Sequence, residues 1–267
     1  PSENIGEVLN QGIDACVNWN DKVGEDFTYN LGLNITFTKN KLRKTNELSN
    51  IEDYRKSIGQ PTSAIFGWQS QGLFGKDVAI AGHPFQSFGN YQVGDIAYAD
   101  LNNDGMVDNN DQTRIGQSFP KTTLGVDVTL NYKGFGLYIL GTATTGVTQM
   151  LTSTYYWNKG LDGYSVLAED RYHPVNNPTG TQPRLTTTSG VNNYRNSTFW
   201  TKNGSFFRLK NVELSYTLNN NSKKGIGKNY KFFVRGANLF VLSGIKELDP
   251  EQMLAGISNY PVYRTIT

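Results

Sequence analysis

The sequence predicts an all-β protein that forms part of a large antiparallel transmembrane β-barrel with long extracellular loops. Three observations lead to this prediction. Two long segments alternate strictly between apolar and polar residues, short and long connections alternate along the chain, and aromatic residues are abundant in a chain of low apolar content. A barrel strand crosses a bilayer as about ten residues of alternating hydrophobicity. No apolar run approaches the roughly 20 residues that a membrane-spanning helix needs.

The composition favours strands and polar loops and argues against several functional classes. Only 37% of the 267 residues are hydrophobic, whereas 28 are glycine, a balance typical of strands joined by polar turns. Lysine plus arginine exceed aspartate plus glutamate by only two charges, so we expect no nucleic-acid partner. The single cysteine, Cys16, excludes an intrachain disulfide. The abrupt start at Pro1 suggests a segment of a longer protein.

The segment 27–38 shows the clearest strand pattern. Every second residue is apolar, and the residues between them are small and polar or glycine. Twelve residues exceed the ordinary strand length of about 5–6 and suit a tilted bilayer crossing. The apolar positions are Phe27, Tyr29, Leu31, Leu33, Ile35 and Phe37.

The segment 122–132 repeats this pattern, with Asp127 on its polar side. That side would line a watery lumen in a large barrel and would face solvent in a soluble sandwich. Weaker strand patterns occupy 13–19, 135–139, 207–218, 230–241 and 260–267, which makes about seven strands. A phase slip at Lys210–Asn211 predicts a β-bulge. Because Phe232 stands beside Phe233, the facing of 230–241 stays open.

The connections alternate between short and long. The short ones follow Trp19, Tyr132 and Leu218, and the second is a tight hairpin through Lys133–Gly134. The long ones cover 39–121, 144–203 and 242–259. Barrels with short periplasmic turns and long extracellular loops show this alternation, whereas such long loops are uncommon in compact soluble domains.

The long connection 39–121 contains a calcium-like loop at 100–111. Oxygen-bearing side chains and a glycine at its sixth position follow the ligand spacing of an EF-hand loop. The last ligand position holds aspartate where glutamate is usual, and no amphipathic helices flank the loop. We therefore weigh a structural calcium, a cofactor of the loop, against a plain Asx-rich turn. The expected ligands are Asp100, Asn102, Asp104, Met106 through its carbonyl, Asp108 and Asp111.

Few side chains suggest catalysis. The two histidines, His83 and His173, lie 90 positions apart with no cysteine cluster, and no glycine-rich phosphate loop opens a helix. We therefore expect no enzyme.

Two aromatic groups suggest other roles. Tyr155, Tyr156 and Trp157 form a cluster suited to contact with a substrate, a partner or other loops. Trp19, Tyr29, Tyr132 and Tyr216 suit an interfacial girdle.

Four blocks resemble the C-terminal region of SusC/RagA-type TonB-dependent transporters from the outer membrane of Bacteroidetes. The longest is GDIAYADLNNDGMVDNNDQTRIGQSFPKTTLGVDVTLNYKGFGLYI at 94–139. The others are ENIGEVLNQGIDACVNW at 3–19, NNYRNSTFWTKNGSFFRLKNVELSYTL at 192–218 and FVRGANLFVLSGIKELDPE at 233–251. These blocks span most of the chain in the family's order.

The resemblance implies a plugged barrel of about 22 strands, of which residues 1–267 would form the C-terminal portion. It also implies TonB-dependent import of glycans or peptides, with a SusD-like surface lipoprotein as partner and a bilayer around the wall. The plug and the segment that contacts TonB would lie outside this chain.

An alternative is a secreted β-sandwich that binds carbohydrate and carries a structural calcium. It would bury the apolar faces of its strands between two sheets. A barrel would leave the same faces exposed to lipid, so the position of these side chains separates the two hypotheses.

Overall fold

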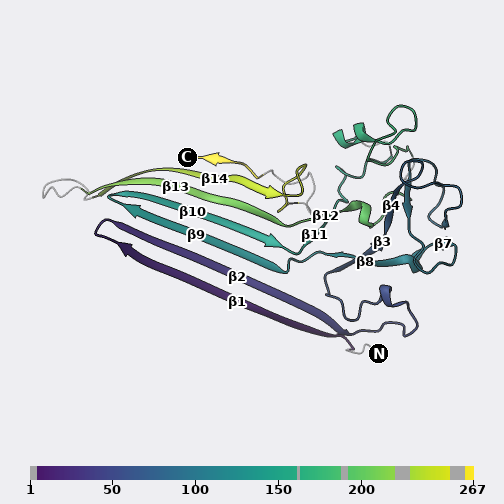
Figure 1. Ribbon diagram of the computed structural model, residues 1–267, viewed down its shortest axis with the longest axis horizontal. Helices are drawn as coiled ribbons and strands as arrows, with labels where there is room; N and C mark the ends of the chain where they lie inside the picture. Colours follow the sequence, from purple (N-terminus) through teal and green to yellow (C-terminus); the bar gives the residue numbers. More distant parts are fainter. Residues whose placement is uncertain (1–4, 161–162, 188–191, 220–228, 253–261) are drawn as a thin grey trace.

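The structure is a computed structural model that describes residues 5–160, 163–187, 192–219, 229–252 and 262–267. A sheet of long strands forms one end of the molecule, and the long connections fold together at the other end (Figure 1). Within the described residues, no helix has the length and apolarity needed to span a bilayer.

The large sheet has seven antiparallel strands whose spatial order follows the chain. Each strand pairs with the preceding strand of the sheet, as in an up-and-down wall. The strands are β1 (Glu7–Val23), β2 (Phe27–Lys44), β9 (Thr122–Tyr132), β10 (Phe135–Thr145), β13 (Phe206–Asn219), β14 (Asn229–Ser243) and β15 (Thr265–Ile266).

Tight turns lie at one end of this sheet, on the left in Figure 1. The β1–β2 turn contains Gly24 at φ 66°, and the β9–β10 turn places Lys133 and Gly134 at φ 47° and 87°. Two successive positive φ angles are those of a type I′ turn, whose twist matches that of the paired strands. The third connection, 220–228, lies outside the described residues.

Several strands are longer than the sequence pattern indicates. β1 and β2 remain paired up to Glu7 and Lys44, although apolar alternation ends near Ile13 and Phe37. The backbone hydrogen bonds continue where the side chains no longer need to alternate. The predicted bulge at Lys210 is confirmed by the register shift between Leu209 and Asn211. Of the strand expected at 260–267, the structure has β15; residues 260 and 261 lie outside the described residues.

The hydrophobic core lies in the long connections. The first connection supplies Trp68 and Tyr98, the second Tyr156 and Trp200, and the third Ile245, all nearly or fully buried. Four two-stranded ladders pair β3 (Ala64–Trp68) with β8 (Gln112–Gln117), β4 (Ser70–Leu73) with β6 (Ile96–Tyr98), β5 (Phe85–Gln86) with β7 (Met106–Val107), and β11 (Thr148–Met150) with β12 (Thr201–Asn203). Short 3-10 helices are η1 (Asp53–Arg55), η2 (Asn109–Asp111), η3 (Val166–Asp170) and η4 (Thr198–Trp200).

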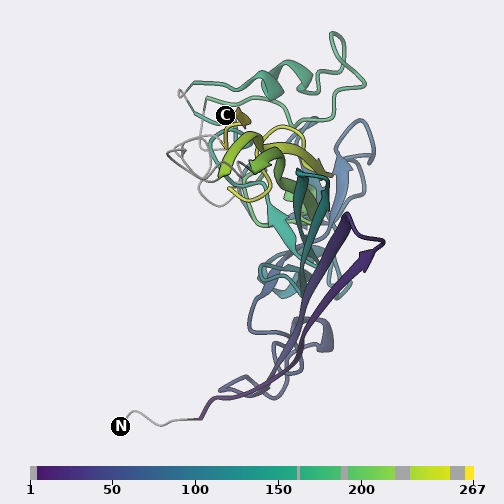
Figure 2. The ribbon, with the colours of Figure 1, turned by 90° about the vertical axis from the view of Figure 1, so that its left-hand side faces the viewer.

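The long strands form a single curved layer (Figure 2). Among the described residues, no second sheet packs against them, and Leu31 is 44% and Leu214 56% exposed. A β-sandwich would bury these side chains. The sandwich alternative is therefore wrong for this sheet.

Candidate functional site: a two-faced wall beneath a folded loop region

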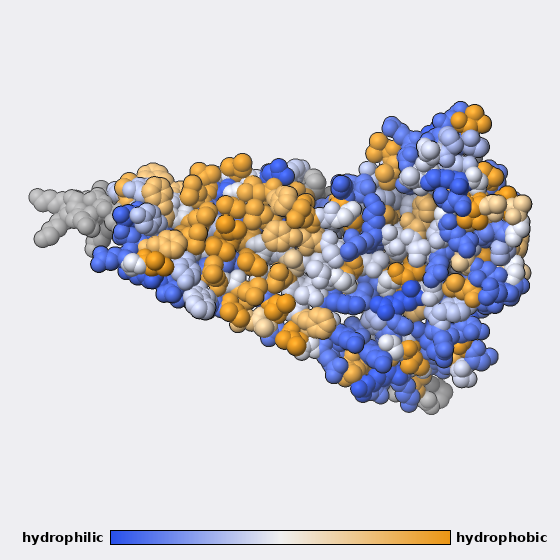
Figure 3. All heavy atoms as spheres, viewed as in Figure 1, coloured by the Kyte–Doolittle hydropathy of each residue, from blue (hydrophilic) through white to orange (hydrophobic). Residues whose placement is uncertain are grey.

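One face of the large sheet is a continuous apolar surface. The paired rows cross the sheet, so that Trp19, Leu31, Val128, Ile139 and Val212 stand side by side. Figure 3 shows the apolar side chains gathered over the long strands, next to a more polar loop region. Those exposed by more than a third include Ile13, Val17, Trp19, Val23, Leu31, Leu33, Ile35, Phe37, Tyr132, Phe135, Leu214, Leu218, Phe232, Val234, Phe240 and Leu242.

The size of this surface matches a bilayer. The rows from Phe27 to Phe37 span ten residue steps. At about 3.3 Å per residue and a strand tilt of about 40°, they form an apolar band about 25 Å tall. That is the height of the lipid-facing band of outer-membrane barrels.

An aromatic row closes the band at the turn end. Phe27, Tyr132, Phe135, Tyr216 and Phe232 occupy one cross-strand row on five strands, and the Phe135 and Tyr216 rings lie 4.6 Å apart. Aromatic rings favour the boundary between hydrocarbon and water. Of the four expected girdle residues, Tyr132 and Tyr216 stand in this row. Tyr29 lies one same-face row further in, and Trp19 lies two.

The other face of the sheet is polar. One of its rows contains Asn20, Asn30, Thr129, Tyr138 and Glu213, and the Asn30 amide donates to Asn20. Its side chains are those that line a water-filled barrel interior. The register also decides which way the side chains of β14 face. Phe232 is on the apolar face, whereas Phe233 is on the polar face opposite Ser215.

A buried carboxylate organises the polar face near β14. Glu213 is 6% exposed and forms ion pairs with Arg235, one strand away, and with Lys231, whose Nζ lies 2.7 Å from Oε1. Arg235 Nε donates to Glu213 Oε2 at 2.8 Å. Paired charges can remain in a partly dehydrated wall because each compensates the other's lost hydration.

A second ion-pair cluster joins β13 to the third connection. Arg208 is 2% exposed, and its Nη2 donates to both carboxylate oxygens of Asp249 at 2.7 Å. Glu251 lies between Arg208 and Lys210, 3.1 Å and 2.9 Å from their nitrogens. These contacts fix the Leu-Asp-Pro-Glu segment against the rim of the wall.

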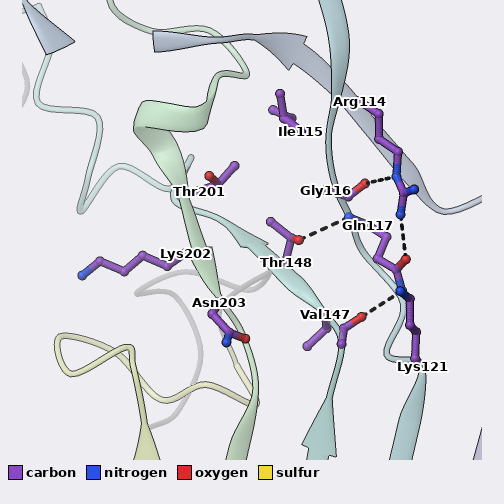
Figure 4. A pocket seen from close by; sticks show the side chains of 11 residues that line it. Arg114, Ile115, Gly116, Gln117, Lys121, Val147, Thr148, Thr201, Lys202 and Asn203 are labelled. Atoms are coloured by element: carbon purple, nitrogen blue, oxygen red, sulfur yellow. Dashed lines mark hydrogen bonds between the residues drawn. The ribbon is translucent and has the colours of Figure 1, made fainter. Parts of the chain in front are cut away.

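A basic cleft of about 420 Å³ lies at the base of the loops, between β8, β11 and β12 (Figure 4). Arg114 donates to the Gly116 carbonyl and to Gln117 Oε1. Gln117 Nε2 donates to the carbonyl of Gly146 at 2.8 Å. Lys202 points away from this network in Figure 4 and pairs with Glu247 at 3.0 Å. The cleft therefore presents hydrogen-bond donors and positive charge close to the strand ends.

The calcium-like loop is held by its own acidic side chains. Asp100 accepts hydrogen bonds from the amides of Asn103 and Gly105 at 2.7 and 2.9 Å, and Gly105 takes φ 85°. The fully buried Asp111 accepts from Leu101 and Asp108. In the described part of the chain, no three His, Cys, Asp or Glu side chains converge on a site for a metal ion. Calcium binding stays a prediction.

The aromatic cluster 155–157 packs inside the loop region. Tyr156 is 3% exposed, and Tyr155 and Trp157 pack partly buried against the same core. Trp157 lies 5.7 Å from the ring of Tyr194 and 6.4 Å from that of Trp200. Loop packing therefore accounts for these contacts, and any ligand would reach only Tyr155 and Trp157.

Sequence reasoning missed most of the polar residues that organise this region. Arg208 pairs with Asp249, 41 positions away, and Glu213 pairs with Lys231, 18 positions away. No local spacing signals such pairs. The bulge at Lys210 offered a partial signal, since it places Arg208 on the polar face.

Comparisons with known proteins agree with the fold. No family model matches the chain. It is 27% identical over 99% of its length to TonB-dependent receptor P26 of Formosa agariphila. It is 25% identical over all of its length to TonB-dependent receptor SusC of Bacteroides thetaiotaomicron. A solved structure of the RagAB peptide transporter superposes with a TM-score of 0.67 over 93% of the chain at 18% identity. The chain spans less than a third of each of these proteins.

Proposed function

We propose that this chain, an outer-membrane segment similar to TonB-dependent receptors of the SusC type, forms part of the wall of a nutrient importer. The observation that carries the proposal is the two-faced sheet. Its apolar face has the height of a bilayer, and its opposite face is polar. Its long connections gather at one end (Figure 1). Such a wall separates lipid from a watery passage.

The imported nutrient is proposed to be an oligosaccharide or a peptide. The relatives are named as TonB-dependent receptors, and the structural neighbour is named as a peptide transporter. The polar row and the basic cleft offer amide, hydroxyl and cationic donors to the hydroxyl and carbonyl oxygens that both classes carry. The names of the relatives also favour a transport role over an enzymatic one.

The loop region is proposed to form the platform for a SusD-like surface lipoprotein. All three long connections contribute to one core, so their outer surface is presented as one body. Such a body suits a protein partner because it loses little conformational entropy on binding. TonB would act through parts of the full-length protein outside this chain.

Uptake measurements test the proposed import. Cells that carry the full-length protein and its genomic neighbours would be given labelled oligosaccharide or peptide mixtures, with and without TonB. We expect accumulation of one class that stops when TonB is deleted. Accumulation that persists without TonB would contradict energised import, and uptake of neither class would contradict the substrate proposal.

We further propose that the loop 100–111 binds a structural calcium ion. The ligand spacing of an EF-hand loop and four carboxylates within twelve residues support it. The competing explanation is a loop held only by the backbone hydrogen bonds to Asp100 and Asp111. The two explanations differ in whether the loop responds to calcium.

A further inference from the structure

A second cavity, of about 300 Å³, lies where the upper end of β2 meets the beginning of β9. It is separate in position from the polar row, and it shares Arg114, Gln117 and Lys121 with the basic cleft. Its remaining lining residues are Phe37, Thr38, Lys39, Asn40, Gly59, Gln60, Pro61, Ser63, Phe119 and Pro120.

The cavity has positive charge without a compensating carboxylate. Lys39, Arg114 and Lys121 line it, and none of its lining residues is acidic. Among the described residues, no carboxylate forms an ion pair with any of the three cations. Arg114 is held in place because it donates to Gln60 Oε1 at 2.9 Å and to Gln117 Oε1 at 3.0 Å. Uncompensated cations that border a cavity favour an anionic ligand.

The cavity borders the upper edge of the apolar band. Phe37 is 43% exposed and is the last apolar residue on the apolar face of β2. Lys39 lies two residues further along the same regularly paired strand, so it stands on the same face. Phe119, 68% exposed, adds an aromatic side chain beside them. Apolar and cationic groups thus follow each other along the strand axis.

We propose that this cavity binds the phosphorylated head group of a lipid of the outer leaflet. A lipid beside the band places its acyl chains against the apolar rows and its phosphates directly above them. Lysine offers a phosphate a mobile point charge, and the planar arginine offers paired donors. The proposal depends on the apolar face meeting lipid, and it is independent of which nutrient is imported.

Lipid binding to the purified full-length protein tests this site. The probe is lipid A with two phosphates, titrated into detergent-solubilised protein, with its dephosphorylated form and phosphatidylcholine as comparison lipids. The variant is Lys39→Gln, because Lys39 lines this cavity and not the basic cleft, and it leaves the hydrogen-bonded Arg114 intact. The matched control is Lys44→Gln on the same strand, because Lys44 is exposed and lines neither this cavity nor the basic cleft.

We expect the cavity variant to weaken lipid A binding about fivefold, which is the contribution of one cation near a membrane surface. The control should bind like the wild type, and dephosphorylated lipid A should bind weakly to all three proteins. Equal affinity in the cavity variant and the control would overturn the proposal. Full competition by millimolar inorganic phosphate would also overturn it, because the site would then take a soluble anion. Uptake of nutrient is measured separately, so loss of this site and loss of import are distinguishable.

Discussion

At the scale of single residues, close approaches of the backbone hold the loop region together. Gly67 in β3 lies against the second connection, where a Cβ atom would stand 2.2 Å from the Asn196 carbonyl oxygen. The adjacent Trp68 amide donates to that same oxygen at 3.0 Å. Because the opposing atom is backbone, no side-chain rotation could relieve the contact.

Replacing Gly67 by alanine should therefore loosen the loop region. Overpacking of this kind costs about 1–3 kcal/mol. The measurement is the rate of limited proteolysis of the loops in the full-length protein. Gly163→Ala is the control, since an added Cβ there meets nothing within 4 Å. Equal proteolysis rates for the two variants would show that the close contact between Gly67 and the Asn196 carbonyl does not stabilise the loop region.

A second residue-scale prediction concerns Arg208. Arg208→Met removes a nearly buried cation and leaves the half-buried Asp249 without the donor to both of its carboxylate oxygens, which should cost about 3–5 kcal/mol. Lys210→Met removes a more exposed pair with Glu251, and should cost at most about 1 kcal/mol. Thermal unfolding of the full-length protein in detergent compares them. The assignment of Arg208 as the main anchor fails if both variants lower the unfolding temperature equally.

At the scale of elements, the strands of the wall are defined by two different forces. Within the band, alternation of apolar and polar side chains fixes which face meets lipid. Beyond Phe37 and Ile13, β1 and β2 continue through backbone pairing, together with an ion pair between Arg43 and Glu7 at 3.1 Å. The bulge at Lys210 keeps the apolar phase of β13 continuous, because it shifts the register of β13 against β10 once.

The alternation of faces can be tested on β2. Leu31→Arg places a cation on the lipid-facing side and should destabilise the assembled barrel by about 2–4 kcal/mol if it lies near the midplane. Asn30→Arg places the same charge on the polar face and should have a much smaller effect. The folded fraction of full-length protein, seen as heat-modifiable mobility in gels, reports both. The two-faced assignment fails if they are equally damaging.

The loop 100–111 is the second element with a testable prediction. If calcium binds, calorimetric titration of the full-length protein should show one exothermic or endothermic site that Asp104→Ala removes. Asp104 suits the test because it is an exposed expected ligand, whereas Asp111 also caps η2. A calcium titration without heat in the intact protein would leave the hydrogen bonds as the sole explanation of the loop.

At the scale of the whole molecule, the exposed apolar face determines how the chain behaves. In the described part of the structure, β1 pairs only with β2, which leaves its outer edge free. A large apolar face and a free strand edge both promote association in water. The chain is thus suited to a longer closed wall in a bilayer.

The 267-residue segment expressed by itself should therefore depend on detergent. We expect aggregation in plain buffer and dispersion in detergent micelles, measured by size-exclusion chromatography with light scattering. The matched comparison is the full-length protein under both conditions. A monodisperse segment in detergent-free buffer would contradict the assignment of the apolar face to lipid.

The sequence alone determined the barrel-type wall, its two faces and the alternation of short and long connections. Strand periodicity is local, and a side chain's face follows from its position along the strand. The amino-acid sequence also predicted the bulge at Lys210 and the tight turn through Lys133–Gly134.

Only the tertiary structure decided what the long connections do. It joined Trp68, Tyr156 and Ile245 into one core, and it brought Arg208 to Asp249. These contacts link residues tens of positions apart, so no local pattern specifies them. The physical reason is that packing and charge pairing depend on distance in space, whereas periodicity reports only the faces of one element.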